Sequence, residues 1–216
     1  MNASNTKAYL FDLNGTMIDD MHYHIQAWHE ILCSHGAALS LAEVKLQCYG
    51  KNDELLERIF PGRFSAAEKT AMSYAKEEAY QAAFKPQLKL LDGLGDYLEA
   101  AKMQGIRMAI GSAAIMFNID FVLDNLHIRH YFDALVSADD VQQSKPDPET
   151  YLKCAAALQV APQHCVVYED SPKGVESAER AGMSSVVLLT LHEVHEFAQF
   201  EKVLCHVPDY KGLALQ

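Results

Sequence analysis

Polar residues of the kinds used in catalysis and ion binding stand where apolar runs of the sequence end. An apolar, aromatic run ends at Asp12, a second run ends at Ser112, and a third ends at Glu169 and Asp170. Lys145 lies in a short turn flanked by prolines. A short apolar run that ends in a polar turn is typical of a buried strand of a parallel sheet. Because ligands bind at the carboxyl edge of such sheets, we expect these groups to face a ligand there.

Together these residue types meet the needs of phosphoryl transfer, which requires a nucleophile, cations and hydrogen-bond donors around the transferred group. A carboxylate such as Asp12 can attack phosphorus and form an aspartyl-phosphate. Lys145 would balance the charge of Asp12 and of the phosphate. The hydroxyl of Ser112, with backbone N–H groups from Ala113 onward at the start of a helix expected from Ala114 to Leu126, would bind phosphate oxygens.

The pair Glu169 and Asp170 would supply oxygen ligands of the kind that Mg²⁺ prefers. Paired carboxylates at the end of a buried strand are costly to gather unless a cation joins them. Each candidate also has an ordinary structural explanation when it is taken alone. Asp12 or Ser112 would serve as a helix cap, Lys145 as a solvated loop residue, and the acidic pair as one cap and one solvated carboxylate.

The elements that position these residues fall into two kinds. From about residue 21 to 84 the pattern is helical, and Ser65 with Glu68 forms a capping box that opens an Ala-rich helix. From Leu91 onward helical and strand patterns alternate, with strands expected at 107–112, 134–137, 165–169, 185–189 and, at an edge, 204–208. The sequence therefore predicts a doubly wound parallel α/β core formed by residues 1–19 and 87–216, with an inserted all-helical cap domain at residues 20–86.

Composition excludes several classes of partner. The 216 residues carry a net charge of −11 and contain no cluster of Lys and Arg, which argues against nucleic acid and anionic membranes as partners. No apolar run approaches the roughly 18–20 residues that span a bilayer, and the acidic N-terminal stretch does not resemble a signal peptide. The five cysteines are widely spaced without a Cys-x-x-Cys motif, so we expect free thiols and a cytoplasmic protein. We expect a monomer or a weak dimer.

In chain order, Asp12, Ser112, Lys145 and Asp170 match the four motifs of the haloacid dehalogenase-like (HAD) phosphotransferases. The first motif of that family, Asp-x-Asp-Gly-Thr, resembles residues 12–16, and its Lys-Pro-x-Pro motif resembles residues 145–148. The resemblance spans nearly the whole chain and implies a Rossmann-like core. It also implies that Asp12, Asn14, Lys145 and Ser112 are catalytic. By the same resemblance, Mg²⁺ would be bound by Asp12, Asn14 through its backbone carbonyl, Glu169 and Asp170.

The helical segment resembles the β-phosphoglucomutase-like subgroup of the family. The positions that carry this resemblance are Tyr23, His24, Ala27 and Trp28, together with Lys76 and Tyr80. It implies that His24 and Lys76 contact the substrate or Asn14, although His24 would equally suit a structural role between cap and core. The arginine that the subgroup uses for a distal phosphate is missing after Gly50, and Lys51 or Arg58 would stand in for it.

Position 14 is the main departure from the family pattern, which has Asp where this chain has Asn14. In the family the second Asp protonates the leaving oxygen, a role worth roughly 10²–10⁴-fold in rate. An amide cannot exchange protons in this way. Three hypotheses follow: a slow or leaving-group-restricted phosphatase, a phosphate-binding protein with residual activity, or conversion of Asn14 to Asp by deamidation next to Gly15.

The sequence therefore predicts a Mg²⁺-dependent enzyme that transfers a phosphoryl group through an aspartyl-phosphate. The expected reaction is hydrolysis of a small phosphorylated metabolite such as a sugar phosphate. The alternatives are a phosphohexomutase and a phosphate-ligand binding protein impaired by Asn14. A haloacid dehalogenase also lacks the second Asp, but the retained Lys-Pro-x-Pro and Glu-Asp motifs argue against that reaction.

Overall fold

The computed structural model describes residues 6–216, which divide into two compact units. The α/β unit consists of the residues up to Asp19 together with Lys89–Gln216, and the helical unit consists of Asp20–Leu88. The chain thus leaves the α/β unit shortly after its first strand and returns to it at Lys89. Each unit has a hydrophobic core of its own.

The α/β unit is built on a six-stranded sheet in the order β3-β2-β1-β4-β5-β6, and every neighbouring pair is parallel. The strands are β1 (Ala8–Phe11), β2 (Arg107–Gly111), β3 (Ala134–Val136), β4 (Cys165–Glu169), β5 (Ser184–Leu188) and β6 (Val203–Val207). β1 lies between β2 and β4, where the strand order reverses. In sheets of this kind that reversal marks the place where ligands bind.

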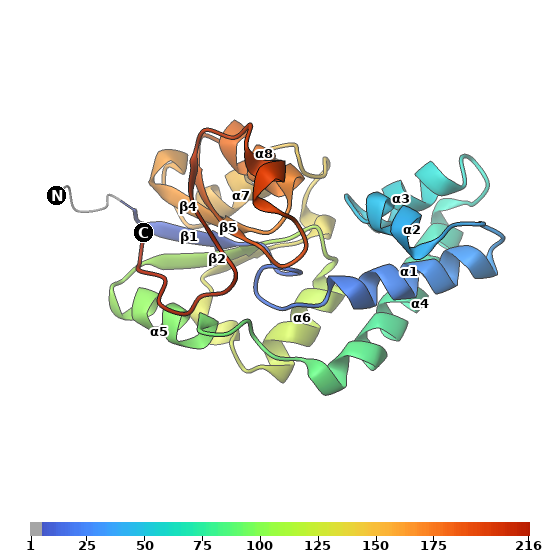
Figure 1. Cartoon of the computed structure of the whole chain (residues 1–216), viewed down its shortest axis with the longest axis horizontal. Coiled ribbons are helices and arrows are strands. Elements are labelled where there is room, and N and C mark those ends of the chain that lie inside the picture. The colour runs from blue at the N-terminus through green and yellow to red at the C-terminus, as the bar shows by residue number, and fades with distance from the viewer. Residues whose placement is uncertain (1–5) are drawn as a thin grey trace. The chain divides into compact units, whose positions relative to one another are not determined.

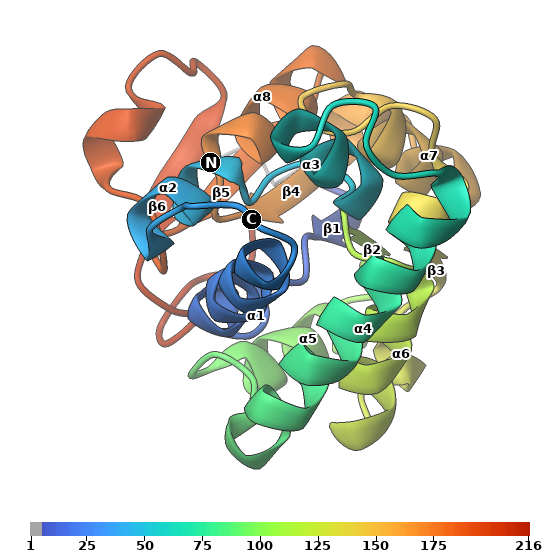
Figure 2. The ribbon, with the colours of Figure 1, turned by 90° about the vertical axis from the view of Figure 1, so that its right-hand side faces the viewer.

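Helices cover both faces of the sheet. α7 (Glu149–Ala157) and α8 (Pro172–Arg180) lie on one face, and α5 (Leu94–Met103) and α6 (Met116–Asn125) lie on the other (Figures 1 and 2). Short 3₁₀ helices complete the unit: η2 (Arg129–Tyr131), η3 (Ala138–Asp140), η4 (Pro162–His164) and η5 (Val194–Phe197). This arrangement confirms the predicted doubly wound α/β fold.

The two faces of the sheet have different cores because successive side chains of a strand point to opposite sides. Ala8 and Leu10 of β1 belong to a cluster with residues of α7 and α8. Tyr9 and Phe11 instead pack among aromatic rings on the other face, which include Tyr97, Tyr168 and Tyr210. The strand that precedes Asp12 is therefore fully buried on both sides.

The helical unit contains α1 (Met21–Ser34), α2 (Leu41–Gln47), α3 (Asn52–Ile59) and α4 (Ala66–Phe84), followed by η1 (Lys85–Gln87). Its core includes Trp28, Leu32 and Leu56. The predicted capping box is present: the Ser65 hydroxyl accepts a hydrogen bond from the Glu68 N–H, and the Glu68 carboxylate accepts one from the Ser65 N–H. The inserted segment is all-helical, as its sequence pattern indicates.

One helix begins later than predicted. The helix expected from Ala114 begins at Met116 as α6. The Ala114 N–H donates to the hydroxyl of Ser112 at 3.2 Å, and Ile115 has an extended backbone. The Met116 N–H donates to Asp139 Oδ2 at 3.0 Å. Side chains from outside the helix therefore satisfy backbone groups that the prediction placed in its first turn.

No helix within residues 6–216 combines the length and the apolar character needed to cross a bilayer.

The segment after β6 docks on the start of α5 through Gly93. Gly93 has φ +83°, and a Cβ there would lie 2.7 Å from both the backbone N of Lys211 and the carbonyl carbon of Tyr210. Gly105 has a similar φ of +70° but no atom within 4 Å of such a Cβ. A substitution at Gly105 would therefore introduce backbone strain alone, whereas one at Gly93 would introduce both backbone strain and steric overlap.

We expect Gly105→Ala to cost about 1–2 kcal/mol of stability, the penalty of a left-handed conformation for a residue with a Cβ. Gly93→Ala should cost more, because the segment around Tyr210 must also move. Urea unfolding of the two variants and the wild type measures the difference. An equal loss of stability in both variants would show that the segment around Tyr210 shifts without an energetic cost.

Candidate active site

The carboxyl ends of β1, β2 and β4 lie side by side. Phe11 is in register with Ile110 of β2 and with Tyr168 of β4. The Asp12 N–H continues the ladder by donating to the Tyr168 carbonyl at 3.0 Å. Asp12, the end of β2 and the acidic pair after Tyr168 are thus brought to one edge of the sheet.

Lys145 is buried at this edge, with its ammonium group among oxygen atoms. Its Nζ lies 2.6 Å from Asp12 Oδ1, 2.7 Å from Glu169 Oε1, 2.8 Å from the Tyr151 hydroxyl and 3.1 Å from the Gly111 carbonyl. Burial alone would lower the pKa of Lys145, but the carboxylates of Asp12 and Glu169 outweigh that effect and raise it above its ordinary value. Lys145 therefore remains a cation.

Glu169 is buried, and both of its carboxylate oxygens accept hydrogen bonds. Oε1 accepts from Lys145 and from the Tyr151 hydroxyl at 2.8 Å, and Oε2 accepts from the N–H groups of Asp170 and Ser171, each at 2.9 Å. Burial would raise the pKa of Glu169, but Lys145 and these hydrogen bonds hold it below its ordinary value. A Cβ at Gly174, in the first turn of α8, would lie only 1.7 Å from Oε1. The glycine thus leaves the space in which this carboxylate lies.

Asp170 is buried, and no side chain within residues 6–216 forms an ion pair with it. The Thr16 hydroxyl donates to its Oδ1 at 3.4 Å, and a Cβ at Gly15 would lie 2.1 Å from its Oδ2. Burial, followed by the negative charges of Glu169 and Asp12, raises the pKa of Asp170 well above its ordinary value. Asp12 and Glu169 thus share the Lys145 ammonium group, and Asp170 is the neighbouring carboxyl group whose ionisation is most opposed.

A divalent cation would favour the ionised form of Asp170, and it fits the hard oxygen donors at this edge of the sheet. Asp12, Asp170 and the backbone carbonyl of Asn14 are the groups that could hold it. Glu169 was also expected among the ligands, but its oxygens are used by Lys145, Tyr151 and backbone N–H groups. Among residues 6–216 no cluster of at least three His, Cys, Asp or Glu side chains is arranged as a metal site.

Asn14 begins a tight loop whose backbone is internally bonded. The Gly15 N–H donates to the Ile18 carbonyl at 2.9 Å, and the Met17 N–H donates to the Leu13 carbonyl at 2.8 Å. Gly15 has φ +74°, a conformation that glycine adopts without strain. The N–H and C=O of a trans peptide point in opposite directions, so the Asn14 carbonyl is directed away from Ile18.

Ser112 and Ala113 follow β2, next to the Gly111 carbonyl that contacts Lys145. The Ser112 hydroxyl is buried and accepts a hydrogen bond from Ala114. That bond uses acceptor capacity and leaves the hydroxyl proton available to donate to an anion. Ser112 is thus suited to bind a phosphate oxygen.

Two of the predicted substrate-binding residues meet inside the helical unit. Lys76 Nζ lies 2.6 Å from His24 Nδ1 and 3.0 Å from Glu77 Oε2. Tyr80 donates to Asp20 at 2.5 Å, and His24 Nε2 lies 3.3 Å from the same carboxylate. Sequence reasoning missed Glu77 and Asp20, because acidic residues on a helix look solvent-exposed unless their buried partners are known. The charge of Lys76 is compensated within its own helix.

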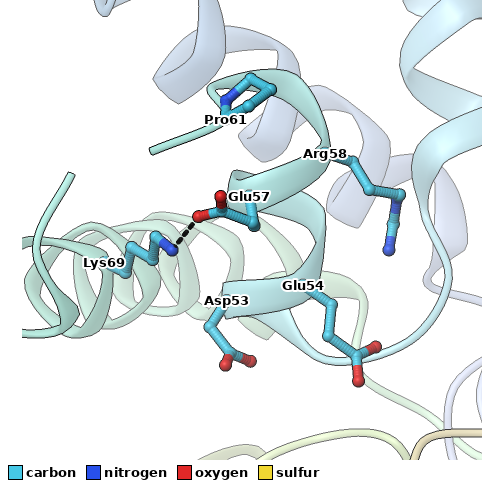
Figure 3. Close-up of a pocket in the computed structure, with 6 residues that line it drawn as sticks. All are labelled: Asp53, Glu54, Glu57, Arg58, Pro61 and Lys69. Carbon is cyan, nitrogen blue, oxygen red and sulfur yellow. Dashed lines mark hydrogen bonds and ion pairs between the residues drawn. The ribbon is translucent and has the colours of Figure 1, made fainter. Parts of the chain in front are cut away.

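The third predicted residue, Lys51, is the N-cap of α3, and the residue after it, Asn52, donates to Glu77 Oε1 at 2.7 Å. The Lys51 backbone N–H donates to Glu54 Oε2 at 3.0 Å. Beside it, an open hollow on the surface of α3 is lined by Asp53, Glu54, Glu57, Arg58, Pro61 and Lys69 (Figure 3). Lys69 pairs with Glu57, and Arg58 donates to the carbonyls of Gln47 and Tyr49. Both cations of the hollow are therefore already engaged.

A sequence model described as haloacid dehalogenase-like hydrolase matches residues 6–182, most of the chain. The chain belongs to the haloacid dehalogenase-like hydrolase family. The resemblance inferred from the motifs at Asp12, Ser112, Lys145 and Asp170 is thereby confirmed.

Relatives within the family are phosphatases and mutases. The fructose-1-phosphate phosphatase YqaB of Escherichia coli (strain K12) is 32% identical over 178 residues, covering 82% of this chain and 93% of the relative. Hexitol phosphatase B of the same strain is 30% identical over 192 residues, covering 84% and 82%. A crystal structure of β-phosphoglucomutase from Clostridium difficile superposes with a TM-score of 0.85 at 27% identity, covering 97% of this chain and 94% of that one. The chain is thus an HAD-like phosphatase or phosphotransferase.

Tyr151 tests whether the bonds around Lys145 matter for the reaction. Tyr151→Phe removes the hydroxyl that bonds both Lys145 and Glu169 but keeps the ring. We expect kcat for a chromogenic phosphomonoester to fall about tenfold, the effect of one hydrogen bond to a charged group. Initial-rate kinetics at saturating substrate measures this change.

Tyr97→Phe is the matched control, because it removes a buried hydroxyl that bonds Tyr168 at 2.5 Å. We expect this variant to lose stability but to keep its kcat. An unchanged kcat in Tyr151→Phe would show that Lys145 holds its position without the phenol.

Proposed function

We propose that this enzyme is a Mg²⁺-dependent phosphatase that works through an aspartyl-phosphate on Asp12. The substrate would be a small phosphorylated metabolite, most simply a sugar or polyol phosphate. The observation that carries the proposal is the buried contact of Lys145 with Asp12 beside the buried carboxyl group of Asp170. The names of the two phosphatase relatives support the substrate class.

In this mechanism a carboxylate oxygen of Asp12 attacks phosphorus, and the bond between phosphorus and the leaving oxygen breaks. Lys145 keeps Asp12 ionised before the attack and offsets charge on the phosphoryl oxygens during it. The Ser112 hydroxyl and the Ala113 N–H donate to those oxygens. A water oxygen then bonds to the phosphorus of the aspartyl-phosphate, the bond from phosphorus to the Asp12 oxygen breaks, and a proton of the water passes to bulk solvent. Phosphate is released and the Asp12 carboxylate is restored.

Asp12, Asp170 and the Asn14 carbonyl would hold the Mg²⁺ ion, which supplies positive charge to the phosphoryl oxygens when bound. Glu169 has a different role in this proposal: it fixes Lys145 against Asp12. Removing either partner of such a buried pair leaves the other charge uncompensated, which is strongly unfavourable. Glu169 and Tyr151 therefore act through the lysine.

Asn14 limits the chemistry of the leaving group. Its side-chain amide cannot donate a proton to a departing sugar oxygen, whereas its backbone carbonyl is unaffected by the change from Asp. We infer that Asp12 is phosphorylated readily by substrates whose leaving group needs no proton, and slowly by ordinary sugar phosphates. This dependence of the rate on the leaving group distinguishes a phosphatase restricted to certain leaving groups from a protein that only binds phosphate.

Transfer to a second position of the same sugar, as in a phosphohexomutase, is the alternative that the structural neighbour suggests. A substrate with two phosphates needs further cations. Lys51 and Arg58 are the cations expected for that role, and Arg58 is already engaged with the carbonyls of Gln47 and Tyr49. Hydrolysis is therefore the favoured reaction.

We propose further that the enzyme works in the cytoplasm as a monomer or weak dimer. Support for the compartment comes from the five cysteines, all of which are free thiols.

Phosphate release tests the proposed function. The wild type, Asp12→Ala and Asn14→Asp are compared on p-nitrophenyl phosphate and on a panel of sugar and polyol phosphates, with Mg²⁺ and with EDTA. We expect the wild type to act on p-nitrophenyl phosphate and Asp12→Ala to be inactive. Asn14→Asp should gain roughly 10²-fold or more on sugar phosphates, because it restores a general acid.

Three results would contradict this proposal. Wild-type activity near that of Asp12→Ala on every substrate would favour a binding protein. Activity that survives EDTA would exclude the Mg²⁺ mechanism. Peptide mapping that finds Asp at position 14 in the active protein would assign the activity to the deamidated form.

A further inference from the structure

The loop after Asp12 is held from outside by hydrogen bonds to three successive backbone carbonyls. The Thr190 hydroxyl donates to the Gly15 carbonyl at 2.6 Å. The Tyr210 hydroxyl donates to the Thr16 carbonyl at 3.2 Å, and the Leu91 N–H donates to the Met17 carbonyl at 2.8 Å. The two hydroxyls come from the C-terminal part of the chain, far in sequence from the loop that they contact.

The same loop contacts the buried carboxyl group of Asp170. Thr16 is held at both ends, because its carbonyl accepts from Tyr210 while its hydroxyl donates to Asp170. The Cα of Gly15 lies directly against the Asp170 carboxylate, where a Cβ would overlap it. Rotation of the peptide between Gly15 and Thr16 would therefore change the position of groups next to Asp170.

The two donors are themselves well anchored. Thr190 lies just after β5. The residue before it, Leu189, is held to the end of β6, because its N–H donates to the Val207 carbonyl at 2.9 Å. Tyr210 is fully buried, and its ring lies 6.4 Å from that of Phe11, the residue before Asp12. Its backbone N–H donates to the Asp92 carbonyl at 2.9 Å. A hydroxyl on a rigid support can fix a flexible peptide plane, whereas a hydroxyl on a mobile side chain would follow it.

We propose that Thr190 and Tyr210 are positioning residues for the cation site. Their hydroxyls hold the Gly15 and Thr16 carbonyls, and this fixes the positions of the Asn14 carbonyl and the Thr16 hydroxyl relative to the Asp170 carboxylate. This inference rests on the proposed function, since it assigns the loop to Mg²⁺ binding. Neither residue touches the phosphoryl group, and both act through the loop.

Magnesium binding by the metal-free protein is the test. Thr190→Val and Tyr210→Phe each remove one hydroxyl while keeping the shape of the side chain. Isothermal titration with MgCl₂ should show a dissociation constant raised about tenfold in each variant, the effect of one lost hydrogen bond. At saturating Mg²⁺ the KM for p-nitrophenyl phosphate should stay near the wild-type value.

Two controls separate positioning from general stability. Thr190→Ser keeps a hydroxyl at the same place and should bind Mg²⁺ like the wild type. Tyr97→Phe removes a hydroxyl from the same aromatic cluster without touching the loop, and should lower stability but leave Mg²⁺ affinity unchanged. Hydrogen exchange of the peptide covering residues 12–18 should be faster in Thr190→Val and Tyr210→Phe than in either control.

Wild-type Mg²⁺ affinity and exchange rates in Thr190→Val and Tyr210→Phe would overturn the positioning role while leaving the phosphatase proposal intact. A wild type that binds no Mg²⁺ and releases no phosphate would overturn both. Equal loss of Mg²⁺ affinity in Tyr97→Phe would show that stability alone explains the effect.

Discussion

The buried ammonium group of Lys145 is the interaction on which the site depends. It is shared by two carboxylates that approach from different strands, Asp12 after β1 and Glu169 at the end of β4. Moving such charges out of water is expensive, and only close pairing with further hydrogen bonds offsets the cost. Tyr151 and the backbone N–H groups around Glu169 supply those bonds. At this edge of the sheet, where apolar packing ends, ion pairs and hydrogen bonds therefore connect the strands.

This pairing is incomplete in a way that suits the chemistry. Lys145 cannot compensate Asp12, Glu169 and Asp170 together, and Asp170 is the carboxylate whose ionisation is most opposed. A site with surplus negative charge would repel a phosphate group if it stood alone. A divalent cation would reverse that situation, because it would favour the ionised carboxylates and attract the anion. Metal and substrate are thus expected to bind with positive linkage.

Sequence reasoning found the residues whose positions follow from topology. Asp12, Ser112 and Asp170 stand directly after apolar runs, and parallel strands bring their carboxyl ends to one edge. Other residues gave no comparable signal. Tyr151 looks like any apolar residue of a helix, and its hydroxyl matters only because Lys145 and Glu169 meet there. Thr190 occurs in a loop with no motif, so only the packing of the chain shows its contact with Gly15.

The start of α6 was predicted too early for a related reason. The periodicity of apolar residues extends back to Ala114, but periodicity cannot show that Ser112 and Asp139 take up the N–H groups of the expected first turn. Helix boundaries are set by competition for backbone hydrogen bonds, and the competitors lie elsewhere in the chain. The interior of each element was predictable because its burial pattern is local, whereas its ends depend on tertiary contacts.

The hydrogen bond from the Gly15 N–H to the Ile18 carbonyl affects the chemical lifetime of Asn14. An asparagine that precedes glycine ages by forming a succinimide, for which the backbone nitrogen of the glycine must attack the side-chain carbonyl carbon of the asparagine. In the folded chain that nitrogen is engaged with Ile18 at 2.9 Å, and the surrounding peptides are fixed by Thr190 and Tyr210. Ring closure would require this loop to open first. We therefore expect the contacts that shape the loop to slow the loss of the amide at Asn14.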